Sequence, residues 1–322
     1  GGNWSPNPVT VDGSETVELQ YTTAETVVLD AEAMDPPTEH ATRCFESGTE
    51  TCEMTFFEAG FLVDVPDHVA DDEVTGTLAA VRESDNTSER CVPGFNGETK
   101  DVELWSDYAN PSSGTESVLV DGASIPTNKT GDTRSLTFDG DGIAAFALRY
   151  PDAGRMQLNA FYEQTDSNAL DFGLVMQGTG GEFVTRPDRF DLTVPGNQAA
   201  TSVEPDNDFT AAGTDFEMEV EALNASGTIT PNFGQESPAE SVVVTSTLVA
   251  PSGGSPGVFA GSFGPFGKDC EGNSATDGTA CGLFQWSEVG IISLMPSLAS
   301  GDYLGTGDVQ GDELSHVGRF IP

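Results

Sequence analysis

Two stretches of the sequence share one pattern and decide the fold: Phe146–Leu158 (FALRYPDAGRMQL) and Gly282–Leu294 (GLFQWSEVGIISL). In each stretch, apolar residues alternate up to an aromatic residue, and an acidic residue and a glycine then precede a second alternating run. Alternation with a period of two residues is the signature of a β-strand with one buried face. An acid-x-Gly turn is typical of the start of the F strand in immunoglobulin-like sandwiches, where Met156 and Ile292 here replace the corner tyrosine.

A second similarity follows each of these turns. Phe183–Phe190 (FVTRPDRF) resembles the closing stretch Val317–Pro322 (VGRFIP), and a repeated unit explains both similarities with one cause. The sequence therefore predicts an all-β protein made of two tandem immunoglobulin-like β-sandwich domains. We place them at residues 1–187 and 188–322, with the first enlarged by an insertion that contains Cys44, Cys52 and Cys91.

The length and the distribution of strand-like runs agree with two such units. The chain has 322 residues, whereas one immunoglobulin-type domain needs only ~100. The tetrapeptide Asp139–Gly142 (DGDG) lies between two alternating arms and is a strong hairpin signal, because aspartate and glycine tolerate positive φ. Other strand-like runs are Thr26–Leu29, Gly60–Val63, Val102–Trp105, Ser117–Val120, Phe216–Ala222 and Ser241–Val249.

The charge balance excludes two classes of partner. Twelve basic residues face 53 acidic ones, which gives a formal net charge of −41. Such a chain repels nucleic-acid phosphate and anionic lipid, so neither is expected as a partner. Salt screens this self-repulsion, and a marine or salt-adapted source would explain the composition. A dedicated cation-binding surface is the alternative explanation.

The five cysteines predict disulfides and an oxidising compartment. Two pairs are close in sequence, Cys44 with Cys52 and Cys270 with Cys281, and the sequence does not say which cysteine remains unpaired. Zinc is not expected, because none of the three histidines lies at ligand spacing from a CxxC motif. No apolar run approaches the ~20 residues of a membrane span, and both ends look cut, so we expect a fragment of a longer protein.

No catalytic motif stands out, and we predict that the protein is not an enzyme. His40, His68 and His316 lie far apart in polar surroundings, and the sequence has no Gly-x-Ser-x-Gly elbow. Among 53 carboxylates, acid pairs suited to glycoside hydrolysis occur by chance and indicate nothing.

Calcium and glycan are the ligands that the residue types allow. Calcium takes six to eight oxygen ligands, and three loops are dense in carboxylates. These loops contain Asp139 and Asp141; Asp206, Asn207 and Asp208; and Asp302, Asp308, Asp312 and Glu313. For Asp139 and Asp141 a plain hairpin turn is the competing explanation. Tyr108, beside Asp107 and Asn110, is the candidate for stacking on a sugar, whereas Trp105 and Trp286 lie on alternating strands and are expected in the core.

Several segments, in order along the chain, resemble one known family. They are Cys44–Cys52, Phe56–Phe61, Cys91–Phe95, Trp105–Gly114, Tyr150–Gly154, Arg186–Phe190, Glu288–Ile292 and Val317–Pro322. Together they resemble the uncharacterised domain, of DUF6701 type, of MshQ-like proteins, which are encoded with the mannose-sensitive haemagglutinin (MSHA) type IV pilus of marine gammaproteobacteria. The resemblance implies a large exported protein with a role in pilus biogenesis or as a pilus-associated surface component. It carries no catalytic residues to transfer.

These observations favour a structural or stalk module that is secreted or exposed at the cell surface. Its expected partners are other domains of the same longer chain and pilus or surface components. Two alternatives remain open: an adhesive tip module that binds glycan or host protein, and a hydrolase.

Overall fold

The computed structural model describes residues 59–82, 92–169, 171–201 and 208–322, together with six short strand segments nearer the N-terminus. The short segments are β1 (Asn3–Ser5), β2 (Glu18–Gln20), β3 (Thr26–Val28), β4 (Phe45–Glu46), β5 (Thr49–Glu50) and β6 (Glu53–Thr55). All regular structure in the described residues is β-strand. None of it is a helix that could cross a membrane.

The first domain is a sandwich of two sheets. One sheet has the order β10-β9-β15-β12-β13, with β7 also paired to β9, and the other has the order β14-β11-β16-β17-β8. The strands are β7 (Ala59–Asp64), β8 (His68–Val69), β9 (Glu73–Arg82), β10 (Val92–Pro93), β11 (Thr99–Asn110), β12 (Leu119–Val120), β13 (Ala123–Ser124), β14 (Thr133–Thr137), β15 (Ile143–Arg149), β16 (Gly154–Glu163) and β17 (Val175–Arg186).

The second domain repeats this plan with fewer strands. Its sheets have the orders β18-β20-β23-β22 and β19-β25-β24-β21, which are the ABED and A′GFC sheets of an immunoglobulin sandwich. The strands are β18 (Arg189–Thr193), β19 (Thr210–Ala211), β20 (Phe216–Leu223), β21 (Val242–Ala250), β22 (Phe259–Phe263), β23 (Thr279–Trp286), β24 (Gly290–Leu298) and β25 (Leu314–Ile321). The predicted tandem immunoglobulin-like fold is confirmed. Within the described residues, β10, β13 and β14 of the first sandwich have no counterpart in the second.

The repeated turn seen in the sequence opens the F strand of each domain, β16 in the first and β24 in the second. Its glycines have nearly the same backbone conformation, with φ of +136° at Gly154 and +134° at Gly290. A Cβ atom at Gly154 would lie 2.9 Å from the carbonyl oxygen of Asn110, and one at Gly290 would lie 2.2 Å from that of Ala250. Asn110 and Ala250 are the last residues of the C strands β11 and β21. The glycine of the acid-x-Gly turn is therefore required because the C and F strands approach closely at this point.

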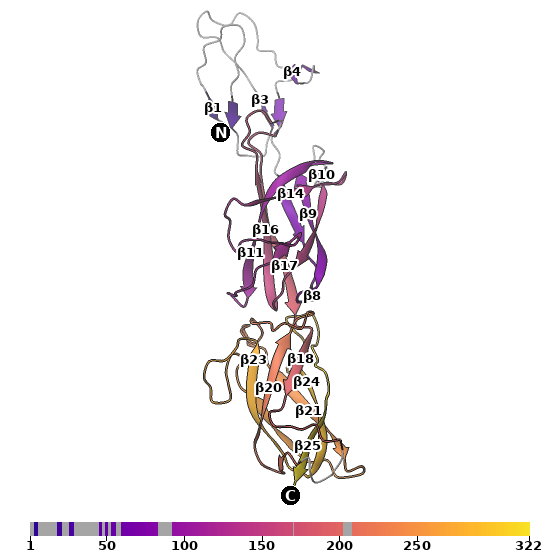
Figure 1. The fold of residues 1–322 in the computed structure, drawn as a ribbon. Coiled ribbons are helices and arrows are strands. Elements are labelled where there is room, and N and C mark those ends of the chain that lie inside the picture. Colours follow the sequence, from indigo (N-terminus) through magenta and orange to yellow (C-terminus); the bar gives the residue numbers. More distant parts are fainter. Residues whose placement is uncertain are drawn as a thin grey trace, which may run out of the picture.

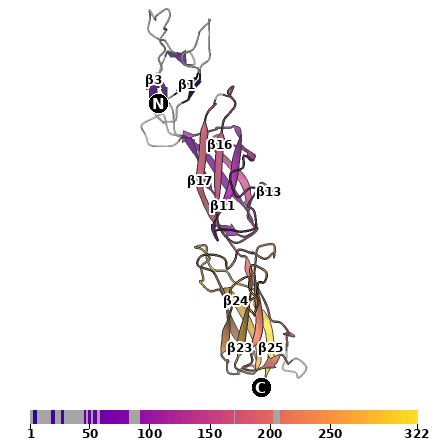
Figure 2. The ribbon, with the colours of Figure 1, turned by 90° about the vertical axis from the view of Figure 1, so that its left-hand side faces the viewer.

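Each domain has its own hydrophobic core. Leu104, Phe138 and Tyr150 are fully buried in the first, and Trp286, Phe190 and Phe320 are fully buried in the second. The sandwiches lie end to end, and the C-terminus is at the end of the second domain that points away from the first (Figure 1, Figure 2). The turn between β17 and β18 connects the two domains.

Candidate functional site at the junction between the domains

The turn that opens β16 faces the second domain and forms the centre of the junction (Figure 1). The second domain meets it with two loops, one between β20 and β21 and one between β24 and β25. Ala153 and Val184 of the first domain pack within the hydrophobic cluster of the second. The domains therefore share part of a core.

Asp152 lies at the centre of this junction with a fully buried side chain. Its Oδ1 accepts hydrogen bonds from the backbone N–H of Ala153 (2.7 Å) and from that of Asn232 in the other domain (3.0 Å). Its Oδ2 has no hydrogen-bond partner within the described part of the chain. Burial raises the pKa of this carboxyl to about 7, although the two backbone donors act in the opposite direction; the charges of Glu116 and Glu236 add to the rise.

Asn232 connects the domains through its side chain as well. Its Nδ2 donates to the hydroxyl oxygen of Tyr150, 3.0 Å away, and the Asn232 side chain is almost completely buried. Burial raises the pKa of Tyr150, so this phenol stays neutral. Tyr108 lies beside Tyr150 and donates its own hydroxyl proton to the carbonyl of Glu116. The sugar-stacking candidate therefore supports the junction, and its ring is only half-exposed.

Further hydrogen bonds join the domains around this centre. Asn110 and Ser237 bond reciprocally: Ser237 N–H donates to Asn110 Oδ1 over 2.9 Å, and Asn110 Nδ2 donates to the Ser237 carbonyl over 3.4 Å. Asn224 Nδ2 donates to the carbonyl of Pro151 over 2.8 Å. In addition, Ala225 N–H donates to the Ala70 carbonyl (3.0 Å) and Arg155 donates to the Leu304 carbonyl (3.1 Å). Such directional contacts fix one orientation of the domains.

A second buried carboxylate, Glu236, stabilises the loop of the second domain that holds Asn232. Its Oε1 accepts from the Tyr303 hydroxyl over 2.6 Å, and its Oε2 accepts from the backbone N–H groups of Gly234 and Glu240. Burial raises the pKa of Glu236, although these donors partly counteract it. Tyr303 is fully buried and stacks on Phe233, with ring centroids 5.9 Å apart.

A polar cleft of about 430 Å³ lies beside the junction. The first domain contributes Ala109–Thr115, and the second contributes Pro231, Asn232, Gln235, Ser237 and Asp277. Hydroxyl, amide and backbone groups dominate this lining, with one carboxylate. The cleft could therefore accept a neutral hydrogen-bonding ligand.

The predicted calcium ligands are distributed over separate loops. Asp139 and Asp141 lie in the β14–β15 turn, where Asp139 Oδ1 accepts from the N–H groups of Asp141 and Ile143, each over 2.9 Å. Asp302, Asp308, Asp312 and Glu313 lie between β24 and β25. No group of three metal-ligating side chains occurs among the residues that the structure describes. Asp206 and Asn207 lie outside those residues. Structural calcium stays a prediction, which melting with and without a chelator would test.

The other predicted residues are placed as follows. Cys270 and Cys281 form a disulfide in the second domain, whereas Cys44, Cys52 and Cys91 lie outside the described residues, as does His40. Trp286 is buried in the second core, and Trp105 is half-buried on β11. His68 and His316 lie in different domains. Burial lowers the pKa of His68, whose ring stacks on Phe183.

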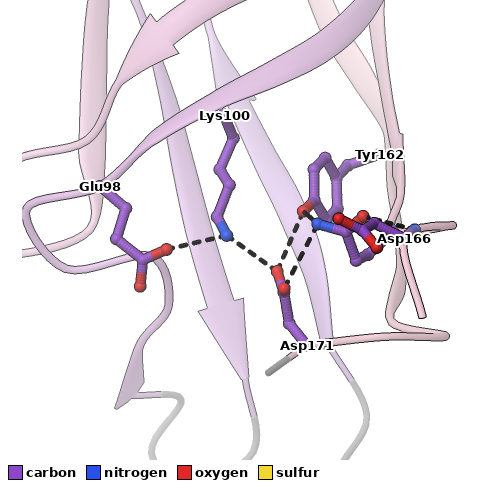
Figure 3. Close-up of polar contacts among 6 residues, drawn as sticks. Glu98, Lys100, Tyr162, Asp166 and Asp171 are labelled. Carbon is purple, nitrogen blue, oxygen red and sulfur yellow. Dashed lines mark hydrogen bonds and ion pairs between the residues drawn. The ribbon is translucent and has the colours of Figure 1, made fainter. Parts of the chain in front are cut away.

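A separate polar cluster surrounds Lys100 in the first domain (Figure 3). Lys100 on β11 contacts Glu98 and Asp171, each over 2.8 Å, and its ammonium lies over the ring of Phe95. Burial alone would lower the pKa of Lys100, but the bonds to the two carboxylates outweigh it and raise the pKa. The cluster fastens the loop between β16 and β17 to β11.

Local sequence patterns do not indicate the residues that make the junction. The acid-x-Gly pattern marks the turn around Asp152 but gives its carboxylate no role, because burial by another domain leaves no local pattern. Asn232 and Glu236 fall in a stretch without periodicity. One available signal was the recurrence of Asn110-Pro111-Ser112 as Ala250-Pro251-Ser252 after the two C strands.

Comparison with protein families identifies both domains. Residues 41–179 match a domain of unknown function, DUF6701, described as its first Ig-like domain, and residues 186–279 match the DUF6701 second domain. This chain contains the first two DUF6701 domains in tandem. The junction described above thus connects the two domains of the DUF6701 region. No curated protein matches the sequence.

Solved structures give weaker similarities. They include the D0–D1 domains of intimin (13% identity, TM-score 0.23, covering 81% of this chain and 97% of that one). The Yersinia pseudotuberculosis adhesin InvE gives 15% identity and a TM-score of 0.30, covering 79% of this chain and 58% of that one. An I67–I69 fragment of titin gives 10% and 0.29, covering 80% and 62%. These scores are too low to carry an argument, so the fold assignment depends on the strand order and the DUF6701 matches.

Proposed function

We propose that this DUF6701 region is a non-enzymatic stalk module of an exported bacterial surface protein that acts with a type IV pilus. The observation that carries the proposal is the junction, where Asp152 and Asn232 are buried between two end-to-end sandwiches. A flexible linker would serve if the domains worked separately. A hydrogen-bonded junction instead maintains a fixed spacing, which is what a stalk requires. The pilus association comes from the resemblance of the sequence to MshQ-like proteins.

Rigidity can be measured directly. Spin labels at one exposed position in each domain should give one narrow distance distribution in the full chain. Asn232→Ala removes the Nδ2 bond to Tyr150, and we expect it to broaden the distribution. Asn128→Ala, in an exposed loop of the first domain, is the matched control and should leave it narrow. A broad distribution in the unaltered chain would contradict the stalk proposal.

The location of the protein tests the remainder of the proposal. Intact bacteria that express the full-length protein with an epitope tag would be labelled with antibody, and a second antibody would mark the pili. We expect surface signal that follows the pili and disappears from cells without the pilus genes. Signal confined to permeabilised cells would contradict surface exposure, and surface signal independent of pili would contradict only the pilus association.

The cleft favours a second candidate function, glycan binding by an adhesive module. Its lining offers hydroxyl and amide groups from both domains, beside the half-exposed Tyr108. If glycans bind there, Tyr108→Ala should abolish signal on a glycan array, and Asn128→Ala should not. An array without signal from the unaltered chain would leave the stalk as the function of this region.

A further inference from the structure

The edge strand β21 of the second domain has an exposed, uncharged outer border. It ends the sheet β19-β25-β24-β21, and in the described part of the chain no backbone hydrogen bond joins its outer edge to another strand. An unpaired edge presents a row of N–H and C=O groups to any strand that can reach it. Natural proteins usually protect such edges with charged residues, especially lysine, or with proline.

β21 carries no charged residue and no proline within its nine residues. It also lies in the longer stretch 241–267, which contains no aspartate, glutamate, lysine or arginine. In a chain with a net charge of −41, this stretch is unusual. Val243 and Val249 of this strand are 48% and 41% exposed, so apolar side chains accompany the bare edge. Both features mark the border of β21 as a contact surface.

The equivalent strand in the first domain shows what normally covers this position. β11 is paired along its outer edge with β14, from Thr99 with Thr137 to Glu103 with Thr133. Beyond that pairing, the Ser106 N–H donates to the Pro126 carbonyl over 2.9 Å. The second domain has no strand equivalent to β14 among its described residues. The border that β14 covers in the first domain therefore has no partner strand in the described residues of the second.

The sequence of β21 indicates what could cover it. Around Ser246 the strand is nearly palindromic, because Thr245 and Thr247, Val244 and Leu248, and Val243 and Val249 are chemically matched pairs. When two copies of a strand pair antiparallel about a two-fold axis at Ser246, each residue faces its matched counterpart. Threonine pairs and β-branched apolar pairs are favourable cross-strand neighbours. Self-complementarity of this kind is the requirement for a symmetric dimer interface.

The side-chain faces agree with this register. Thr245 and Thr247 are exposed on the outer face of the sheet, whereas Val242 is buried on the inner face. In the two-fold register, residues of one face meet residues of the same face in the partner. A bulge between Leu248 and Ala250 ends the regular part of the strand, so regular pairing extends from Val244 to Leu248.

We propose that two copies of this chain associate through β21, antiparallel about a two-fold axis at Ser246, so that two four-stranded sheets become one continuous sheet. Association at this edge goes beyond the proposed stalk function, because it connects stalks side by side. It also avoids the acidic surface, since the contact lies where the chain is uncharged. Screening by salt weakens the repulsion between the two acidic molecules. The dimer should therefore tighten as ionic strength rises.

Sedimentation velocity of the full chain tests the association. We expect a reversible monomer–dimer equilibrium whose dimer fraction grows with protein concentration, and grows again between about 0.05 and 0.5 M salt. Replacing Thr245 and Thr247 together with glutamate places like charges opposite each other at the axis. This variant should weaken the dimer by about tenfold or more. Monomer at every concentration in high salt, or a dimer unaffected by the two glutamates, would overturn the proposal.

Two matched variants distinguish this register from a general effect of charge. Thr245→Lys with Thr247→Glu places a lysine opposite a glutamate only in the antiparallel two-fold register, so dimerisation should be restored. Thr127→Glu with Thr130→Glu adds the same two charges at exposed positions in a loop of the first domain and should leave the dimer unchanged. Failure of the lysine–glutamate variant to restore the dimer would exclude the register.

A crosslink reports the axis itself. Residues directly opposite in an antiparallel pair have Cα atoms ~4.5–5.5 Å apart, within the range that a disulfide can span. Ser246→Cys should therefore form a covalent dimer under mild oxidation, much faster than Ser262→Cys on the exposed part of β22. Equal rates for the two variants would place the contact elsewhere and count against the proposal.

Discussion

The two domains share one strand plan, yet equivalent elements have different neighbours. The turn before the F strand buries Asp152 beneath the second domain, whereas its counterpart Glu288 is exposed. The C strand β11 is covered by β14, whereas no strand in the described part of the chain pairs with the outer edge of β21. The shared plan therefore explains the folding of each domain, and the differences show where the molecule makes contacts. The turn of the first domain contacts the second domain, and the edge of the second is available for a further contact.

The largest expected effect tests the feature that the domains have in common. Gly290→Ala introduces a Cβ 2.2 Å from the Ala250 carbonyl oxygen at a φ of +134°, which we expect to cost about 3–4 kcal/mol of stability. Gly154→Ala, with its nearest atom at 2.9 Å, should cost less. Scanning calorimetry, which can resolve separate domain transitions, is the measurement.

Gly301→Ala is the matched control for this strain. Gly301 also has positive φ, +71°, but a Cβ there would meet nothing within 4 Å. Its substitution should cost only about 1 kcal/mol. If the Gly290→Ala and Gly301→Ala variants had the same melting temperature, the close approach of the C and F strands would not explain why glycine recurs at this turn.

The next effect concerns the second domain, which contains the Cys270–Cys281 disulfide. This bond closes a short loop with a sequence separation of 11 and ends on β23. Loop-closure entropy predicts that Cys270→Ala with Cys281→Ala destabilises this domain by ~3 kcal/mol. Reductant should lower the melting temperature of the unaltered second domain but leave that of the double variant unchanged. If reductant also lowered the melting temperature of the double variant, the loss of stability would come from other cysteines.

The predicted fold came from local patterns, and this explains where sequence reasoning stopped. Period-two alternation and the turns at Gly154 and Gly290 reflect forces within one domain, so they predicted strands, sandwiches and a boundary near residue 187. The burial of Asp152 depends on loops more than 70 residues away, such as the one that contains Asn232. No periodicity encodes that contact.

The candidate ligand contacts came from residue type alone, and local sequence gives no information on their neighbours. Residue type suggested Tyr108 as a ligand contact, and the structure shows that its hydroxyl donates to the Glu116 carbonyl and lies beside the hydroxyl of Tyr150. The palindrome of β21 was visible in the sequence, but it acquires meaning only once β21 is known to be an edge strand.

A smaller effect, about 2 kcal/mol, tests the junction through pH. Burial raises the folded-state pKa of Asp152 to about 7 from an ordinary value of 3.8. Between these values the folded protein binds more protons than the unfolded chain, so stability should rise as the pH falls from 8 to 5. The raised pKa of Glu236 acts in the same direction, and the charges of Glu116 and Glu236 oppose ionisation of Asp152.

Asp152→Asn removes the titrating group while keeping an oxygen for the N–H of Asn232. We expect the variant to be more stable than the unaltered chain at pH 8 and to show a flatter dependence of melting temperature on pH. Asp139→Asn, at an exposed turn of the same domain, is the control and should retain the full slope. If the melting temperature of Asp152→Asn depended on pH as steeply as that of the unaltered chain, a group other than Asp152 would cause the pH dependence of stability.

The smallest effect belongs to the cluster around Lys100, and its pH dependence has the opposite sign. Asp171 is partly buried, which alone would raise its pKa, but hydrogen bonds from Lys100 and Tyr162 outweigh burial and lower it. The contribution to stability is therefore present above the ordinary value of 3.8 and is lost as the pH falls through the lowered pKa. Asp171→Asn should cost about 1 kcal/mol of stability at neutral pH, measured by urea unfolding of the first domain.

Glu98→Gln is the control, because it alters the other carboxylate that contacts Lys100. The Glu98 side chain is 56% exposed, so this substitution should cost less than about 0.5 kcal/mol. Equal losses of stability in the two variants would mean that solvent screens the Lys100–Glu98 and Lys100–Asp171 pairs alike. The partly buried Asp171 would then not be the residue that fastens the β16–β17 loop.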